Sequence, residues 1–134
     1  MSATRSEMVA SAAFTASGVS AAFPIPTANH VMVGVDITAA SGTPVLDLWL
    51  QGSDDGGTTW YDMPFDIALQ TSTSATEGTT RSNDRSIIDN RTSTTVPAQF
   101  IALYKSVATD RIRLKWIISG TTPSFTFSAS MVAK

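Results

Sequence analysis

The sequence predicts an all-β protein, an antiparallel β-sandwich of the jelly-roll or immunoglobulin-like kind, and two observations carry this prediction. Hydrophobic residues alternate with polar residues at a period of two in four separate runs. Short segments rich in Gly, Ser, Thr and Pro separate the runs at 41–44, 53–57 and 119–123, where we expect turns. The chain has 134 residues, of which 43% are hydrophobic and 15% are charged, so one domain with one core is expected.

The four alternating runs are the expected strands, at 30–37, 46–50, 111–118 and 123–132. Each run places its hydrophobic residues on one face, which we expect to point into the core. In the third run the opposite face carries Arg111, Arg113 and Lys115, a basic stripe that faces solvent or an acidic partner. The predicted core residues are Val31, Val33, Val35, Ile37, Leu46, Leu48, Leu50, Ile112, Leu114, Trp116, Ile118, Phe125, Phe127, Ala129 and Met131.

The start of the chain is predicted to be an N-terminal arm at 1–22, ahead of a single sandwich domain at 23–134. Residues 7–14 are rich in alanine, but Thr15, Ser17 and Gly18 interrupt any helix. The prolines in 23–26 cannot donate to a central strand, so this stretch is expected to lead from the arm into the sheet. Small apolar residues dominate 8–23, and we expect the arm to pack on another subunit in a homodimer or homotrimer.

A long Ser/Thr-rich excursion at 70–98 breaks the strand pattern. A loop of this length is unusual in a compact domain unless it has a function or is ordered by something it touches. One alternative is a strand that folds back on its own sheet. The other is an arm that contacts a neighbouring chain, and for this alternative the predicted contact residues are Arg85, Ile87, Ile88 and Arg91.

The stretch from Ser53 to Trp60 is the sharpest motif, and it reads S-x-D-x-G-x-x-W. It resembles the Asp-box of sialidases and many other β proteins, in which the motif connects the strands of a hairpin. The Asp55 carboxylate is expected to accept backbone N–H groups of the turn, Gly57 to take a positive φ, and Trp60 to fold back on the hairpin. The motif therefore predicts a structural turn built by Ser53, Asp55, Gly57 and Trp60.

Enzymatic and metal-binding functions find little support in the composition. The chain contains no cysteine and one histidine, His30, so thiol chemistry, zinc sites and a nucleophile relay are not expected. Glycosidase chemistry by resemblance to sialidases would need repeated boxes, an arginine cluster and a tyrosine nucleophile, and the chain is short for a propeller. Calcium at Asp54 and Asp55 is disfavoured, because few further carboxylates lie nearby. We expect no enzyme, no cofactor and no metal.

The net charge of −2 also limits the partners. It argues against bulk electrostatic attraction to nucleic acid or to an anionic membrane. No apolar run approaches the length of a membrane span, and no signal peptide is recognisable, so a soluble protein made in a cytoplasm is expected. The partners are expected to be proteins.

Two segments, 46–69 and 111–134, carry a resemblance to small structural proteins of tailed-bacteriophage virions. The shared features are a hydrophobic strand ending in Q-x-S, the D-G-G-x-x-W turn, and the R-x-x-W-x-x-x-G-x-x-P-S-F-x-F-S ending from Arg113 to Ser128. The resemblance implies a capsid decoration (cement) protein. Such a protein is assembled in the host cytoplasm, binds the outer surface of the major capsid protein lattice and stabilises the head. It also implies alternatives, namely a neck, tail or fibre component.

A carbohydrate-binding module is the alternative from a different class. It would use exposed Trp49, Trp60 or Tyr61 to stack on sugar rings. Trp60 is already explained by the turn, and Trp49 shares its strand face with Asp47. Glycan binding distinguishes this function from decoration, and copy number per virion distinguishes decoration from a neck or tail role.

Overall fold

The fold is a single antiparallel β-sheet, seen in a computed structural model that describes residues 4–25, 30–63, 87–91, 96–105 and 109–134. Within these residues there is no helix, and hence none that could cross a membrane. The eight strands are β1 (Thr4–Phe14), β2 (Gly18–Val19), β3 (Phe23–Pro24), β4 (His30–Ser53), β5 (Tyr61–Asp62), β6 (Ile87–Arg91), β7 (Ala98–Lys105) and β8 (Arg111–Ala133).

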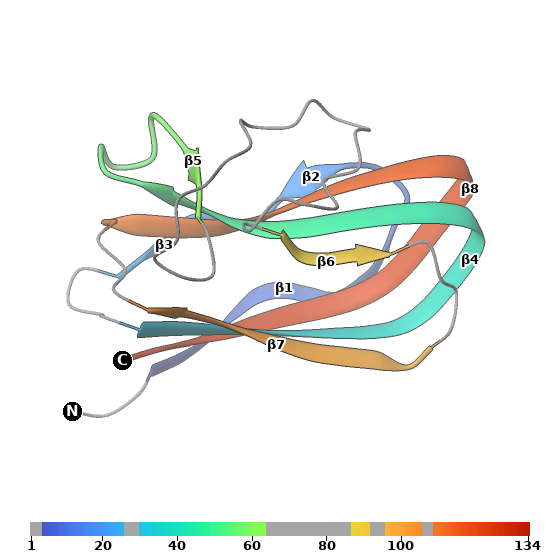
Figure 1. The fold of residues 1–134 in the computed structure, drawn as a ribbon, viewed down its shortest axis with the longest axis horizontal. Coiled ribbons are helices and arrows are strands. Elements are labelled where there is room, and N and C mark those ends of the chain that lie inside the picture. The colour runs from blue at the N-terminus through green and yellow to red at the C-terminus, as the bar shows by residue number, and fades with distance from the viewer. Residues whose placement is uncertain (1–3, 26–29, 64–86, 92–95, 106–108) are drawn as a thin grey trace.

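Two very long strands, β4 and β8, form the centre of this sheet. They pair with each other almost from end to end, from Val31 opposite Ala133 to Ser53 opposite Arg111. Both strands bend at the same place, so one sheet folds over into two facing layers (Figure 1). We call them the lower layer, with 30–37 of β4 and 125–133 of β8, and the upper layer, with 46–53 of β4 and 111–118 of β8.

The bend uses two of the three segments that were predicted to be turns. Gly42 and Gly120 lie in the segments 41–44 and 119–123 and have φ of +80° and +106°. A side chain at Gly120 would overlap the carbonyl oxygen of Thr43, and one at Gly42 would overlap that of Thr122. The pairing register also shifts between Ser41 and Thr43. These segments are therefore bulged bends inside continuous strands, because a glycine with positive φ in each strand lets both strands turn together.

Shorter strands flank the central pair on both sides. On the side of β8, β1 pairs in the lower layer, and β2 and β3 pair in the upper layer. On the side of β4, β7 pairs in the lower layer, and β5 and β6 pair in the upper layer. The sheet thus has the N-terminal strands along one edge and β5, β6 and β7 along the other.

The predicted N-terminal arm differs from what the structure shows. Residues 4–14 form β1 along β8, and Met8 and Val9 are buried in the core. Phe14 packs edge-on against Trp116, with ring centroids 5.1 Å apart. Residues 4–14 are therefore part of the sheet, because their backbone pairs with β8 and two of their side chains pack into the core.

The core lies between the two layers and contains the residues that the alternation predicted. All fifteen predicted core residues are buried, and Ile118, the most accessible of them, is 8% exposed. The interior face of the lower layer is formed by Val31, Val33, Val35 and Ile37 with Phe125, Phe127, Ala129 and Met131, and these meet the leucines and Trp116 of the upper layer. The all-β, antiparallel class is confirmed, while the jelly-roll connection stays a prediction.

The long excursion contains a strand. Within 70–98 the structure places 87–91 as β6, paired with Leu46–Trp49 of β4. Residues 70–86 and 92–95 lie outside the described part of the chain. For 87–91, the structure therefore agrees with the first alternative, a strand that folds back on its own sheet.

Candidate functional site

The turn after β4 is held by the two polar side chains that the motif singles out. Asp55 Oδ1 accepts hydrogen bonds from the backbone N–H groups of Thr58 at 3.0 Å and Thr59 at 2.8 Å. The Ser53 hydroxyl donates to Asp55 Oδ1 at 2.8 Å and accepts from the N–H of Gly57 at 2.9 Å. Asp55 Oδ1 therefore accepts three hydrogen bonds inside the turn, which gives Asp55 a structural role.

These hydrogen bonds also set the ionisation of Asp55. The backbone N–H of Thr59, followed by the Ser53 hydroxyl, lowers the pKa of Asp55 to about 2. Donors aimed at a carboxylate favour its charged form. Asp55 is thus a permanent anion at neutral pH and is not suited to act as a general acid.

Two further groups close the turn. Asp110, next to β8, accepts the N–H of Gly56 at 3.1 Å. Gly57 has φ of +100°, and its carbonyl accepts the indole N–H of Trp60 at 3.0 Å. The Arg113 guanidinium lies over the Trp60 ring at 4.2 Å from the ring centroid. Ser53, Asp55, Gly57 and Trp60 therefore lie together in the turn, and Asp110 and Arg113 tie it to β8.

A polar network extends from the turn along the outer face of the upper layer. Asp62 Oδ1 accepts the indole N–H of Trp49 at 2.7 Å and the side-chain amide of Gln51 at 3.0 Å. The amide oxygen of Gln51 accepts Arg113 Nε at 2.9 Å. Burial lowers the pKa of Arg113. The network positions β5 against β4, and the sequence pattern did not reveal it, because Gln51 and Asp62 carry no local motif.

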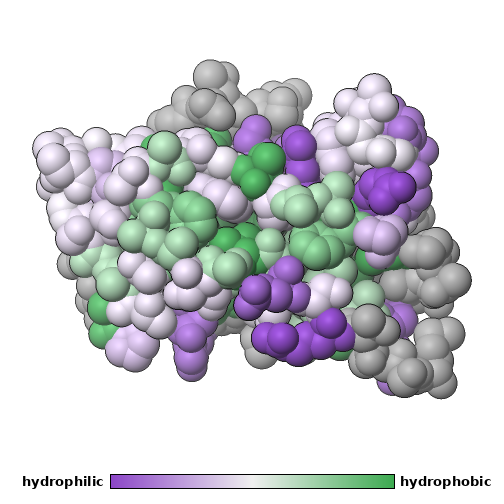
Figure 2. Space-filling model, turned by 180° about the vertical axis from the view of Figure 1, so that it is seen from behind, coloured by the Kyte–Doolittle hydropathy of each residue, from purple (hydrophilic) through white to green (hydrophobic). Residues whose placement is uncertain are grey.

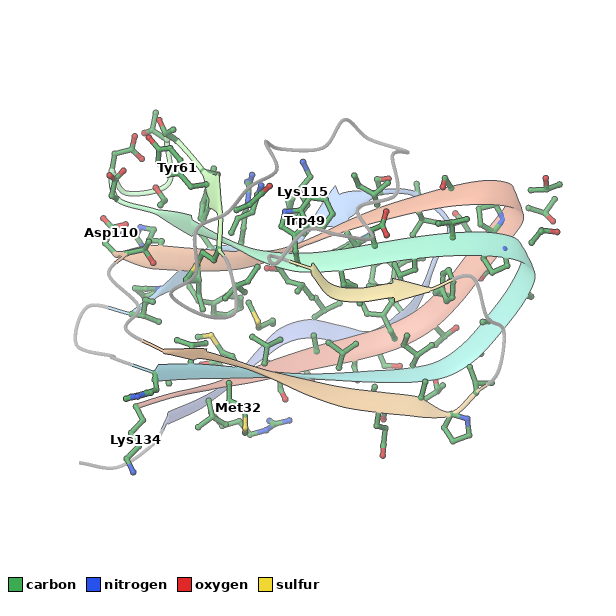
Figure 3. All side chains as sticks on the ribbon, in the orientation of Figure 1. Met32, Trp49, Tyr61, Asp110, Lys115 and Lys134 are labelled. Atoms are coloured by element: carbon green, nitrogen blue, oxygen red, sulfur yellow. The ribbon has the colours of Figure 1, made fainter. Side chains whose placement is uncertain are left out.

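Two residues of the basic stripe, Arg113 and Lys115, contact residues of this network or the turn. Arg113 is committed to Gln51 and Trp60, and Lys115 Nζ lies 5.6 Å from the Trp49 ring centroid (Figure 3). Cations over aromatic faces are held by the ring quadrupole. The stripe therefore supports the outer face of the upper layer.

The three tryptophans offer no open platform for a sugar ring. Trp49 is 1% exposed and Trp116 is 5% exposed, and Trp60 packs on the turn with Arg113. Tyr61 is different, since 57% of it is exposed and it projects beside the turn (Figure 3). Of the aromatic residues predicted for carbohydrate binding, Tyr61 alone presents an open surface.

The predicted partner-contact residues are only partly placed. Ile87, Ile88 and Arg91 lie in β6, at an edge of the upper layer, and Arg85 lies outside the described residues. His30 begins β4, where its backbone pairs with that of Lys134. Across the described residues, no three His, Asp or Glu side chains gather as metal ligands would.

An apolar surface lies along the N-terminal edge of the sheet. Figure 2 shows a band of hydrophobic residues across the face that lies behind Figure 1, flanked by hydrophilic residues. β1, β2 and β3 form this edge, and the segment 8–23 contains no charged residue. The exposed apolar residues of this segment are Ala10, Ala12, Ala13, Ala16, Val19, Ala21 and Ala22.

Comparison with known proteins gives a fold relationship. No protein-family model matches the chain. No curated protein sequence matches it either. Among solved structures, the crystal structure of the SPBc2 prophage-derived protein YomS is similar, with a TM-score of 0.51 and 13% sequence identity. The similarity covers 99% of this chain and 94% of that chain, so the two proteins share their fold over nearly their whole lengths.

Proposed function

We propose that the chain is a structural protein of a tailed-phage virion, and specifically a decoration protein on the outside of the capsid. The observation that carries the proposal is the fold shared with a prophage-derived protein over almost the full length of both chains. The virion-protein resemblance of 46–69 and 111–134 supports it independently. The described residues of these segments, 46–63 and 111–134, form most of the upper layer and the C-terminal half of β8, so the resemblance includes the structural centre of the domain.

The mechanism is binding, without catalysis. A protein that binds only the assembled major capsid lattice stabilises it by mass action, and many copies engaged at once add their effects. The bent sheet suits this task, because β4 and β8 are each shared by both layers and the layers cannot separate without breaking these strands. The turn at Ser53–Trp60 then serves as one end of the domain, held by its own hydrogen bonds.

Self-association is part of the proposal, as a homodimer or homotrimer built on the N-terminal edge. A sheet edge of a monomer is normally protected by charges or prolines. The segment 8–23 has neither, and its alanines are exposed. An uncharged surface can meet a copy of itself without repulsion between like charges.

Charged substitutions test this edge better than truncation, because removing the segment would also remove Met8 and Val9 from the core. Val19 is 44% exposed, so Val19→Lys is expected to leave the fold intact. We expect it to shift the protein to a smaller species in sedimentation. Thr58→Lys adds the same charge at the exposed turn and is expected to sediment as wild type. Equal sedimentation of all three proteins would remove the N-terminal edge from the proposal.

Head binding tests decoration directly. Purified protein is mixed with undecorated heads of the phage, and co-sedimentation and heat resistance of the heads are measured. We expect saturable binding and heads that resist higher temperature. Heads that neither retain the protein nor gain heat resistance would rule out decoration and favour a neck, tail or fibre position.

The contacts predicted for Arg85, Ile87, Ile88 and Arg91 remain a prediction. Because β6 pairs with β4, replacing Ile87 and Ile88 by Ser now has two distinct outcomes. Lower head occupancy with an unchanged melting temperature would support a contact role. A lower melting temperature would mean that these isoleucines stabilise the domain itself.

Carbohydrate binding is retained as a second function because of Tyr61. Its exposed ring is the feature that could stack on a sugar. A glycan array probed with wild type and with Tyr61→Ala tests this directly. Glycan binding that disappears in the variant would favour a receptor-binding component over decoration.

A further inference from the structure

A groove lined by charged and polar side chains together with apolar surface lies on the outer face of the lower layer, away from the turn. Its volume is about 550 Å³. Its floor runs over the central strands, which contribute small residues there, and its walls come from longer side chains of the flanking strands β1 and β7. Met32, on the same outward face of β4, points away from the layer below the ribbon in Figure 3. The floor residues are Gly34, Ser128 and Ser130, and the wall residues are Arg5, Glu7 and Gln99.

Gly34 is the first indication that a ligand or another chain binds over the floor of the groove. The fold requires glycine at Gly42 and Gly120 in the bend, and Gly18 lies tightly under Trp116. At Gly34, by contrast, an added Cβ would meet nothing closer than Ser130 Oγ at 3.7 Å, and φ is not positive. Glycine weakens the interior of a strand, and where the fold does not need it, it often marks close approach of a ligand or another backbone.

Asp36 is the second sign. It lines the groove two residues beyond Gly34, on the same face of β4. Its Oδ1 is buried and has no hydrogen-bond partner among the described residues. Its cross-strand neighbours are Gln99 on β7 and Ser128 on β8, neither of which donates to it. Because no described residue donates to the buried oxygen, the charge of the carboxylate is balanced only through its accessible part, which lines the groove and is open to a donor from outside.

The charges of the groove indicate the kind of donor. Among the described lining residues Asp36 and Glu7 are acidic and Arg5 is basic, so their summed charge favours a cation. Ser128, Ser130 and Gln99 offer hydroxyl and amide groups that can pair with peptide N–H and C=O groups. An extended polypeptide with a basic side chain satisfies both requirements, since its backbone can lie over Gly34 while the cation reaches Asp36.

We propose that this groove is the site at which an extended segment of the capsid lattice protein binds, with a Lys or Arg side chain against Asp36. The inference rests on the proposed function for the identity of the partner. The chemistry of the groove itself can be tested without heads.

The first experiment uses isolated protein and a short peptide, acetyl-Gly-Arg-Gly-amide, in an NMR titration. We expect shifts of the backbone amides of Gly34, Asp36, Ser128 and Ser130, and weaker shifts with acetyl-Gly-Gln-Gly-amide. Asp36→Asn should weaken binding roughly tenfold or more, because a charge-assisted hydrogen bond is lost. Asp54→Asn makes the same charge change on the exposed turn and should bind like wild type. Shifts outside the groove, or equal binding by both variants, would overturn the assignment of the groove.

The second experiment fills the groove and measures binding to undecorated heads. Gly34→Val places methyl groups over the floor, and Gly34→Ala is the milder variant should valine disturb the sheet. We expect melting temperatures at or above that of wild type, because a β-branched residue suits a strand better than glycine. Head occupancy should fall in both Gly34 variants and in Asp36→Asn.

The outcomes separate the two proposals. If wild-type protein does not bind heads, the proposed function fails and the lattice partner fails with it. If wild type binds heads and the Gly34 and Asp36 variants bind them equally well, the groove is not the docking site although decoration stands. If the variants instead change the sedimentation of the protein alone, the groove holds a second copy of the chain, which would also overturn the proposal.

Discussion

The two halves of β4 make an instructive comparison, because they belong to one strand and face the same core. In the lower layer, 30–37 alternates buried and accessible residues, with Met32 37% exposed on the outer face. In the upper layer, 46–53 is buried at every position, and the outward residues Asp47, Trp49, Gln51 and Ser53 are at most 7% exposed. The inner faces are equivalent, and the outer faces are not.

The difference shows what each outer face is for. Polar groups buried on the upper layer need partners, and Trp49, Gln51 and Ser53 have them in hydrogen bonds to Asp62 and to the N–H of Gly57. Such a network fixes one arrangement of β5 and of the turn. The outer face of the lower layer is open and carries the groove with Gly34 and Asp36. We therefore assign structural support to the upper outer face and partner binding to the lower one.

The largest expected effect tests the equivalence of the inner faces. Phe127 in the lower layer and Leu48 in the upper layer are both fully buried. Replacing Phe127 by Ala is expected to reduce the free energy of unfolding by about 3–5 kcal/mol, and Leu48 by Ala by about 2–5 kcal/mol. Denaturant unfolding of both variants checks this. A small loss at one of the two positions would mean that the layers do not share one core.

The next effect separates the two outer faces. Trp49→Phe keeps an aromatic ring but removes the indole donor to Asp62, and a loss of about 1–3 kcal/mol is expected for a buried polar group left without its partner. Met32→Gln, the matched change on the lower outer face, is expected to stay within about 0.5 kcal/mol of wild type. Similar losses in the two variants would remove the contrast between the faces.

A smaller effect is expected at the turn that ends the upper layer. Ser53→Ala removes the acceptor of the Gly57 N–H and one donor to Asp55, which should cost about 1 kcal/mol. Ser41→Ala, in the bend, serves as a control, because Ser41 is exposed and takes part in no side-chain hydrogen bond among the described residues. Thermal melting of both variants distinguishes the turn from the bend.

The smallest effect is a dependence of stability on pH. The pKa of Asp55 is lowered to about 2 in the folded protein, below its ordinary value of 3.8. The stabilisation by ionised Asp55 is therefore present above pH 3.8 and is lost as pH falls toward 2. Asp55→Asn should show a weaker loss of melting temperature over this range than wild type. Parallel pH profiles for the two proteins would mean that Asp55 is not held by the turn.

The sequence predicted the features that follow from regular alternation. The fifteen core positions and the antiparallel class could be predicted because each strand exposes its two faces to different surroundings. The turn at Ser53–Trp60 could be anticipated because its hydrogen bonds join residues close in sequence. Gly42 and Gly120 were assigned to turns, since a bulged bend and a hairpin turn use the same residue types.

The features that the sequence did not reveal depend on contacts between distant residues. Arg113 of β8 donates a hydrogen bond to Gln51 of β4, and the two residues are far apart in the sequence. Asp36 lines a groove only because residues of β1, β7 and β8 complete the lining. The edge role of 4–14 also depends on a partner strand more than a hundred residues away. An alanine-rich segment without clear alternation gives no local signal for that pairing.

The central claim, that this chain decorates the capsid in many copies, is tested most directly by quantitative mass spectrometry of purified virions. The ratio of this protein to the major capsid protein is measured with isotope-labelled reference peptides from both. Decoration predicts a copy number that rises in proportion to that of the major capsid protein. A copy number that matches a single ring at the neck or tail, or absence from the virion, would contradict the claim.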